Sequence, residues 1–280
     1  MANIAVIGIC GNSVFLSVDS FHKPGETAVA KDCFEEIGGK GINQAFAAAR
    51  MGAEVAFLAA IGSDAHGTAC IAAAKAEGID GCFAVKDGKR TTFAYILTDA
   101  SGENRVTVCP GAELCVQDVL DFEPRIAASD ILLLQQEVPP EVNETAIALA
   151  SRHGTRVMLN PAPVRSFPKA LAEQVYLATP NAHEQKSIHG LPFQNLVTTL
   201  GEQGCLINHE TAIPATAVSP VDTTGAGDTF NGILAVCLAE GMDLPTACRY
   251  AVTGSGISVT RKGVLSAIPY RSEIERMITK

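Results

Sequence analysis

The stretch VDTTGAGDTFNG (Val221–Gly232) places two threonines and the run Gly225-Ala226-Gly227 directly before an aspartate and an apolar segment that should form a helix. Glycine and threonine are poor helix formers, so this start weakens the helix locally. Bare backbone N–H groups at a helix N-terminus collect partial positive charge and suit a phosphate group. The stretch therefore predicts an anion site formed by Gly225, Ala226 and Gly227.

Asp228 follows this run, and two interpretations fit it. Beside a phosphate site, its carboxylate would be able to take a proton from an attacking hydroxyl. Aspartate is also well suited to cap a helix N-terminus, so a structural role stays open.

A second glycine-rich helix start is IGGKGINQ (Ile37–Gln44). Its glycines, Gly39 among them, would let another molecule approach the backbone closely, and Lys40 and Asn43 would offer it polar groups. The alternative is a tight strand-to-helix turn with a solvated lysine.

The order of apolar runs predicts the fold class. Strands are expected at 3–9, 54–62, 130–137, 155–161 and 175–181, and helices at 43–52, 67–79, 141–154, 228–241 and 244–260. This alternation is typical of an α/β protein with a central, mostly parallel sheet and helices on both faces.

Two stretches depart from that order. Residues 13–37 and 88–108 alternate apolar and polar side chains with period two, around turns at Pro24-Gly25 and at DASGEN (99–104). We expect them to form a small antiparallel sheet, a discontinuous β lid of about 12–38 and 88–110 over a single domain spanning 1–280. The alternative is an extension of the main sheet's edge.

Composition limits the partners. The chain of 280 residues is 47% hydrophobic and 18% charged, and its net charge is −9. An acidic chain is a poor match for nucleic acid or a membrane surface. No signal peptide and no apolar run of ~20 residues is evident. The nine cysteines form no Cys-x-x-Cys pair and predict reduced core residues of a cytoplasmic protein without a zinc site.

Two common nucleotide motifs are missing. The first strand lacks the Gly-x-Gly-x-x-Gly pattern of a dinucleotide fold, and FEEIGGKGIN (34–43) lacks the first glycine and the hydroxyl of a Walker loop. The sequence therefore argues against a Rossmann dehydrogenase and a P-loop ATPase.

The two glycine-rich signatures together resemble those of the ribokinase-like (PfkB) carbohydrate kinases, and the ribokinase branch is the nearest. PGET (24–27), LNPAP (159–163), TPN (179–181), TLGEQG (199–204) and VTRKG (259–263) occur in the family's order. The resemblance implies ATP-dependent transfer of a phosphoryl group to a hydroxyl, as a rule a primary one, of a small sugar. Asp228 would be the base and Gly225–Gly227 the anion hole, which suits a reaction that depends on positioning and charge stabilisation.

Matching positions carry the family's further roles as implications. The sugar would contact Gly39, Lys40, Asn43, Glu137 and Asp228. ATP would contact Asn181, Glu184, Thr199, Gly201, Gly204 and Gly227, with Glu184 acting on Mg²⁺ through water. An activating K⁺ would lie among Asp222, Thr224, Ser258, Arg261, Gly263 and Ala267. Structural alternatives are an exposed helix-face carboxylate for Glu184, a turn cap for Glu137 and a helix-end charge for Arg261.

One departure concerns the sugar. Ribokinases carry Gly-Ser-x-Asn-x-Asp after the first strand, whereas here Gly11 stands in place of the asparagine and Ser13 in place of the aspartate. A hydrogen bond to a charged group contributes about 1.5–3 kcal/mol. The exchange is thus expected to weaken ribose binding about ten- to a hundredfold and indicates a different sugar, unless Asn12 or a lid residue compensates.

A second departure is a shortened segment between Asn181 and Thr199, which predicts that one surface helix is missing or reduced. A nucleoside kinase and a non-catalytic sugar- or nucleotide-binding protein stay open as alternatives. The resemblance also implies a homodimer through the lid, which the apolar positions of residues 14–30 would permit.

Overall fold

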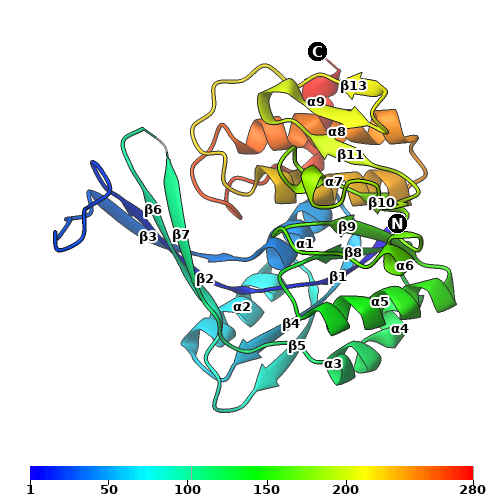
Figure 1. Ribbon diagram of the computed structural model, residues 1–280, viewed down its shortest axis with the longest axis horizontal. Helices are drawn as coiled ribbons and strands as arrows, with labels where there is room; N and C mark the ends of the chain where they lie inside the picture. Colours follow the sequence, from blue (N-terminus) through cyan, green and yellow to red (C-terminus); the bar gives the residue numbers. More distant parts are fainter. Residues whose placement is uncertain (102, 280) are drawn as a thin grey trace.

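The computed structural model describes residues 1–101 and 103–279 and is built around a six-stranded parallel sheet (Figure 1). In the order in which they pair, its strands are β10 (Leu177–Ala178), β9 (Arg156–Asn160), β8 (Ile131–Gln135), β1 (Asn3–Ile7), β4 (Glu54–Gly62) and β5 (Asp80–Lys86). Parallel strands are buried on both faces, which explains their nearly continuous apolar sequences.

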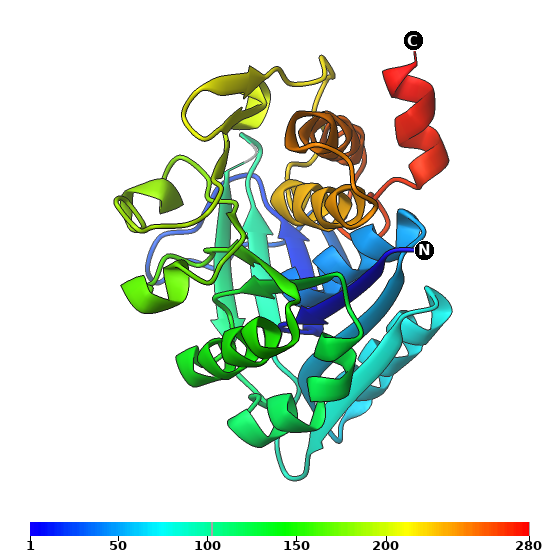
Figure 2. The same cartoon turned by 90° about the vertical axis from the view of Figure 1, so that its right-hand side faces the viewer.

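Helices cover both faces of this sheet (Figures 1 and 2). One layer holds α1 (Lys40–Arg50), α2 (Ala65–Ala76), α7 (Ala226–Ala239), α8 (Leu244–Ser258) and α9 (Arg271–Ile278), and the other holds α3 (Val116–Asp121), α4 (Glu123–Ala127), α5 (Pro140–His153) and α6 (Lys169–Ala172). Strand β1 serves both layers, because Ile4 and Val6 enter the first core while Ala5 and Ile7 enter the second. The predicted fold class is confirmed.

A separate four-stranded sheet forms the lid, which projects from the main body in Figure 1. Its strands, in pairing order, are β3 (Asp32–Gly38), β2 (Gly11–Ser17), β6 (Phe93–Thr98) and β7 (Asn104–Cys109). Among the described residues it shares no strand pairing with the central sheet, so the edge-extension alternative is wrong. Gly102, in the predicted DASGEN turn, lies outside the described residues.

The lid is antiparallel only in its outer pairs, because the central pair of β2 and β6 is parallel. Each of these two strands is the outgoing arm of a separate excursion from the central sheet, so both run in the same direction. Their return strands, β3 and β7, pair on the outside. The strands predicted within 13–37 are shorter than expected, because β2 ends at Ser17, β3 begins at Asp32 and an exposed loop around Pro24 joins them.

The segment after β10 lacks a full helix, as predicted. Between Asn181 and Thr199 its helical structure is the single 3₁₀ turn η1 (Glu184–Lys186). A small antiparallel sheet follows that the sequence did not reveal, with β11 (Val197–Thr199), β12 (Cys205–Ile207) and β13 (Thr211–Ile213) around η2 (Gly201–Gln203). Three-residue strands are too short to show a period.

Helix α1 begins at Lys40, three residues before the predicted start at Asn43. Low propensity at Gly41 is overridden because this turn packs closely on the end of β1: a Cβ at Gly41 would lie 2.7 Å from Gly8 Cα. Across residues 1–101 and 103–279, no helix combines the length and apolar character that crossing a bilayer requires.

Candidate active site

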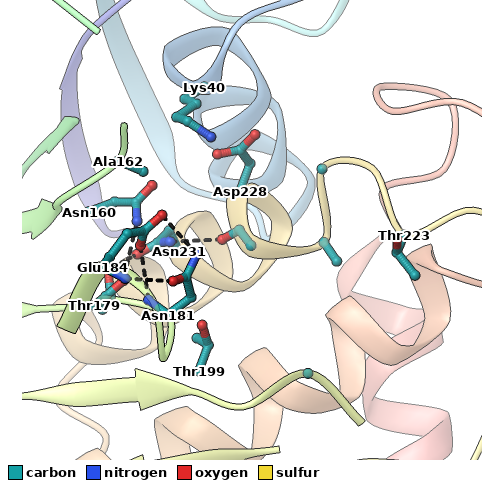
Figure 3. A pocket seen from close by; sticks show the side chains of 14 residues that line it. Lys40, Asn160, Ala162, Thr179, Asn181, Glu184, Thr199, Thr223, Asp228 and Asn231 are labelled. Carbon is teal, nitrogen blue, oxygen red and sulfur yellow. Dashed lines mark hydrogen bonds between the residues drawn. The ribbon is translucent and has the colours of Figure 1, made fainter. Parts of the chain in front are cut away.

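A cavity of about 320 Å³ lies at the carboxyl edge of the central sheet, the edge at which ligands of open α/β sheets bind. Its wall combines the starts of α1 and α7 with residues that end or follow β9 and β10. The lining residues are Lys40, Asn160, Ala162, Thr179, Asn181, Glu184, Thr199, Gly201, Thr223, Gly225, Ala226, Gly227, Asp228 and Asn231 (Figure 3). The two glycine-rich helix starts of the sequence therefore meet at one site.

Asp228 is buried in the first turn of α7, and its carboxylate is held from α1. Oδ2 accepts from Asn43 Nδ2 at 2.8 Å, and Oδ1 accepts from Gln44 Nε2 at 3.0 Å. The N-cap of α7 is Gly225, and no side chain caps this helix. The capping interpretation of Asp228 is thus wrong.

The close crossing of α1 and α7 makes these bonds possible. Gly232 lies one turn after Asp228, and a Cβ at Gly232 would lie 2.5 Å from both Ala47 Cβ and Gln44 O. A side chain there would push the two helices apart. The glycine therefore sets the distance at which the amides of α1 reach the carboxylate of α7.

The ammonium group of Lys40 points toward Asp228 across the cavity (Figure 3). The negative charge of Asp228 raises the pKa of Lys40, and Glu137 and Glu184 add to this, whereas burial opposes it. A cation in the first turn of a helix opposes the helix dipole. The surrounding carboxylates offset that cost and keep Lys40 charged, so the solvated-lysine interpretation is wrong.

Glu137 lies two residues beyond β8, and its Oε2 accepts the backbone N–H of Lys40 at 2.9 Å. Burial raises the pKa of the Glu137 carboxyl, and the charge of Asp228 acts in the same direction while Lys40 opposes both. The capping alternative is therefore partly right, because this carboxylate fixes the first amide of α1. Glu137 is not among the residues that line the cavity, and it contacts the cavity wall through Lys40.

The glycine-rich start of α7 presents backbone amides to the cavity. Gly225 adopts a left-handed conformation with φ 74°, and the first bond of the helical ladder runs from Thr229 N–H to Gly225 O at 2.9 Å. The amides of Gly227 and Asp228 precede that ladder. They form a donor set for an anion next to the Asp228 carboxylate.

Asn181 and Glu184 are hydrogen-bonded to each other on the cavity wall opposite α7. The carboxylate of Glu184 accepts the backbone N–H of Asn181 at 2.9 Å and its Nδ2 at 2.8 Å. Glu184 is buried, so the exposed helix-face alternative is wrong. With its oxygens already engaged, the carboxylate suits Mg²⁺ that keeps its own waters. The described residues contain no cluster of three or more acidic, His or Cys side chains able to hold a metal directly.

Several cavity residues escaped sequence reasoning. Asn160 at the end of β9 accepts from Gln44 Nε2 at 3.2 Å, and Asn231 donates to Gly227 O at 2.7 Å. Thr179 donates to Asn231, which links β10 to α7. These residues lie inside the motifs LNPAP, TPN and TFNG, but a motif alone does not reveal which of its members point into a cavity.

Of the residues matched to ATP contacts, Thr199 and Gly201 line the cavity, whereas Gly204 lies outside the cavity wall. It has φ 90°, and a Cβ there would collide with Ile213 O, so this glycine is needed for the turn between β11 and β12.

The residues of the sugar departure lie on the lid and outside the cavity wall. Ser13 of β2 pairs with Glu36 of β3. A side chain at Gly11 would collide with the backbone oxygen of Thr92, so an asparagine does not fit there. Gly39, with φ 118°, caps α1 where β3 joins it. The departure from the family pattern is therefore built into the packing at Gly11.

The residues matched to K⁺ gather behind the start of α7. Asp222 accepts Thr224 N–H at 2.9 Å and Gly263 N–H at 3.3 Å. The Arg261 amide donates to Ser258 O at 3.1 Å, and its side chain reaches Ala267 O at 3.4 Å. Arg261 also pairs with Glu273, so its side chain joins the loop to α9. Carbonyl and carboxylate oxygens of this kind suit a hard cation.

An anion site at a helix start, a buried carboxylate and a charged lysine at the edge of a parallel sheet are what a phosphotransferase needs to position and stabilise the transferred group. Comparison with known proteins agrees. The family model described as pfkB family carbohydrate kinase matches residues 1–271. A ribokinase of Bacillus subtilis is 35% identical, with full coverage of both chains.

Solved structures give the same result. The ribokinase of Thermotoga maritima superposes with a TM-score of 0.90 at 33% identity, over all of both chains. The ribokinase of Arabidopsis thaliana, solved with ribose and ATP, superposes with a TM-score of 0.85 at 26% identity, again over all of both chains. The chain belongs to the PfkB family of carbohydrate kinases and is an ATP-dependent kinase of its ribokinase-like group.

Proposed function

We propose that this kinase transfers the γ-phosphoryl group of ATP to a hydroxyl, in the first place a primary one, of a small free sugar. The observation that carries the proposal is the fixed carboxylate of Asp228 beside the free amides at the start of α7. Asp228 takes the proton of the attacking hydroxyl, and the free amides at the start of α7, those of Gly227 and Asp228, hold the charge that develops on the transferred group. The Ala226 amide of the predicted Gly225–Gly227 set already donates to Thr223 O at 3.3 Å.

The sugar lies between the start of α1 and the lid in this proposal. Lys40, Asn43 and Glu137 contact its hydroxyls from the main domain, with Gly39 and Ser13 on the lid side. Asn43 supports this role, because its Oδ1 is buried without a hydrogen-bond partner and would accept from a hydroxyl. Because Ser13 and Gly11 replace the family's polar pair, we propose that D-ribose is not the preferred sugar.

ATP extends from α7 toward Asn181, Glu184, Thr199 and Gly201. Mg²⁺, held by Glu184 through water, would neutralise phosphate charge. K⁺ would bind at oxygens of Asp222 and of the other residues that match the family's cation site, which are Thr224, Ser258, Arg261, Gly263 and Ala267. The cytoplasmic location expected from the composition stays part of the proposal.

A homodimer through the lid also stays a proposal. Val106 and Val108 of β7 are each 56% exposed, and they pair with Ile96 and Ala94 on the face of the lid that carries Phe15. An apolar face of this kind favours a second copy. Gel filtration tests it, and a monomer at micromolar concentration would count against the dimer.

The test of the reaction is ADP release with Mg²⁺, K⁺ and ATP across pentoses, deoxysugars, hexoses, sugar alcohols and nucleosides, with D-ribose included. We expect turnover of a free sugar other than D-ribose. Preference for a nucleoside would support the alternative kinase class. No ADP release with any compound of the panel, while ATP still binds, would support a binding protein without catalysis.

A further inference from the structure

Glu36 on lid strand β3 holds the segment that follows α8. Its Oε2 accepts the backbone N–H of Val264 at 2.7 Å, and its Oε1 accepts that of Ser266 at 2.8 Å. A carboxylate that accepts two N–H groups makes charge-assisted bonds, which are stronger than neutral ones. One side chain of the lid therefore holds two backbone amides of a loop in the main domain.

Neighbouring contacts reinforce the same junction. Lys262 pairs with Asp32 of β3, and its ammonium lies 4.7 Å from the centre of the Phe34 ring. Phe34 stacks on Phe15 of β2 with ring centres 4.6 Å apart. The lid and the segment 262–266 are thus joined by charge, hydrogen bonds and aromatic packing.

Val264 connects this junction to the start of α7. Its side chain is buried against Phe15 and Ile96 of the lid. On its other side, a Cβ at Gly225 would lie 2.5 Å from Val264 Cγ1. Val264 is therefore wedged between the lid and the residue that opens the anion site, and Gly225 can sit there only because it has no side chain.

A second link runs through the backbone. The N–H of Gly263 donates to Asp222 Oδ2, while Asp222 Oδ1 accepts the N–H of Thr224. Residues 263 and 264 thus contact the loop before α7 at two points, Asp222 and Gly225. Movement of the segment that Glu36 holds would move both ends of that loop.

We propose that Glu36 is a positioning residue through which the lid sets the geometry of the Gly225–Gly227 amides. When Glu36 accepts the amides of Val264 and Ser266, the lid holds Val264 in place. Val264 and Gly263 then hold the loop 222–225. A bound sugar that holds the lid in place would then strengthen nucleotide binding at the phosphate site. By linkage, nucleotide would strengthen sugar binding by the same factor. The catalytic meaning of the amides rests on the proposed function, but the mechanical coupling does not.

Glu36→Gln tests the coupling in the ligand-free protein, with Glu35→Gln as the matched control. Glu35 is the neighbouring residue on the same strand, but its Oε2 accepts from Asn12 Nδ2 at 2.8 Å, and the 264 and 266 amides donate to Glu36 instead. Gln at position 36 keeps one of the two oxygens, so one of the two backbone N–H groups would face its NH2 group, which cannot accept. Amide hydrogen exchange is followed in peptides spanning 221–230 and 261–268.

We expect exchange in 261–268 to become about ten- to a hundredfold faster in Glu36→Gln, as the loss of a charge-assisted bond predicts. The hydrogen-bonded amides of Thr224 and Thr229 in 221–230 should also exchange faster. Glu35→Gln should leave both peptides unchanged. Faster exchange confined to 261–268, no change in either peptide, or equal changes in the control would each overturn the proposal.

Val264→Ala gives a second, independent route. It keeps the backbone N–H that Glu36 binds but removes the side chain that packs on Gly225. Exchange should become faster in 221–230 while the Ser266 amide stays protected, and unchanged exchange in 221–230 would overturn the packing link through Val264.

Kinetics give a further test. With a sugar that the substrate panel identifies, Glu36→Gln should lower kcat at least about tenfold, whereas Glu35→Gln keeps it within twofold. If no compound of the substrate panel is phosphorylated, the proposed function fails but the hydrogen-exchange result still tests the coupling. The two proposals can therefore fail separately.

Discussion

The Gln44 side-chain amide lies 3.0 Å from Asp228 Oδ1, and both groups are buried. Gln44 is in turn held by Gln135, whose Nε2 donates to Gln44 Oε1 at 2.7 Å. The amide can therefore point only one way: its oxygen faces Gln135 and its nitrogen faces the carboxylate. This chain of amides fixes the rotamer of Asp228 from the core of the protein.

Gln44→Leu should lower kcat for the preferred sugar by about ten- to a hundredfold, because the carboxylate loses a hydrogen bond and its fixed position. The matched control is Asn143→Leu. Asn143 is also buried and donates to Gln135 O at 2.7 Å, but it does not touch Asp228. Both variants should lose stability in thermal melts, and equal losses of kcat would show that Gln44 has only a structural role.

Ser13→Asp should raise kcat/KM for D-ribose by about ten- to a hundredfold if this position governs the choice of sugar. It should also cost stability, up to about 1 kcal/mol, because Ser13 pairs directly with Glu36 and like charges across strands repel.

Ser17→Asp is the control for that change. Ser17 pairs with Asp32 at the far end of the same two strands, so the new carboxylate also faces a like charge. Its stability should fall similarly while ribose kinetics stay unchanged. Ribose turnover that Ser13→Asp fails to improve would mean that sugar choice lies elsewhere in the pocket.

Glu137→Gln should make the protein more stable relative to wild type as the pH rises. Burial raises the pKa of Glu137, so the folded state binds its proton more tightly than the unfolded chain. Wild type therefore loses stability from the ordinary Glu value of about 4.3 upward through the raised value, and the variant does not.

Urea unfolding at pH 4 and at pH 7 measures this difference, with exposed Glu210→Gln as the control. The free energy of unfolding of Glu137→Gln, minus that of wild type, should be larger at pH 7. A difference that is the same at both values, or that reverses, would show that Lys40 outweighs burial at this carboxylate. Kinase activity should fall in either case, because the sugar loses a charged partner.

The sequence was most informative where one physical requirement left a local trace. Glycines before Asp228 predicted a backbone donor site, and those at Ile37–Gln44 predicted close approach of a ligand beside Lys40 and Asn43. Alternating runs predicted the two kinds of sheet. The sequence could not show that α1 and α7 cross at Gly232, because such a contact joins residues far apart in the chain. Gln44 was therefore missed as a partner of Asp228.

The errors have similar causes. Gly204 matched an ATP-contact motif, but the turn into β12 requires a glycine there for steric reasons. The parallel pair at the centre of the lid depends on how two excursions from the main sheet meet, which period-two alternation does not encode. Nothing in the sequence singles out Glu36, because its partners Val264 and Ser266 lie far away in the chain.

The most direct test of the account is the kinetics of Asp228→Asn with a sugar that the panel identifies. The substitution keeps the size of the side chain and one oxygen for the amides of Asn43 and Gln44, so the variant should fold and bind ATP normally. Its kcat should fall by about 10²–10⁴ because the proton acceptor is gone. A folded variant with near-normal kcat would contradict the assignment of Asp228 as the base and, with it, the proposed mechanism.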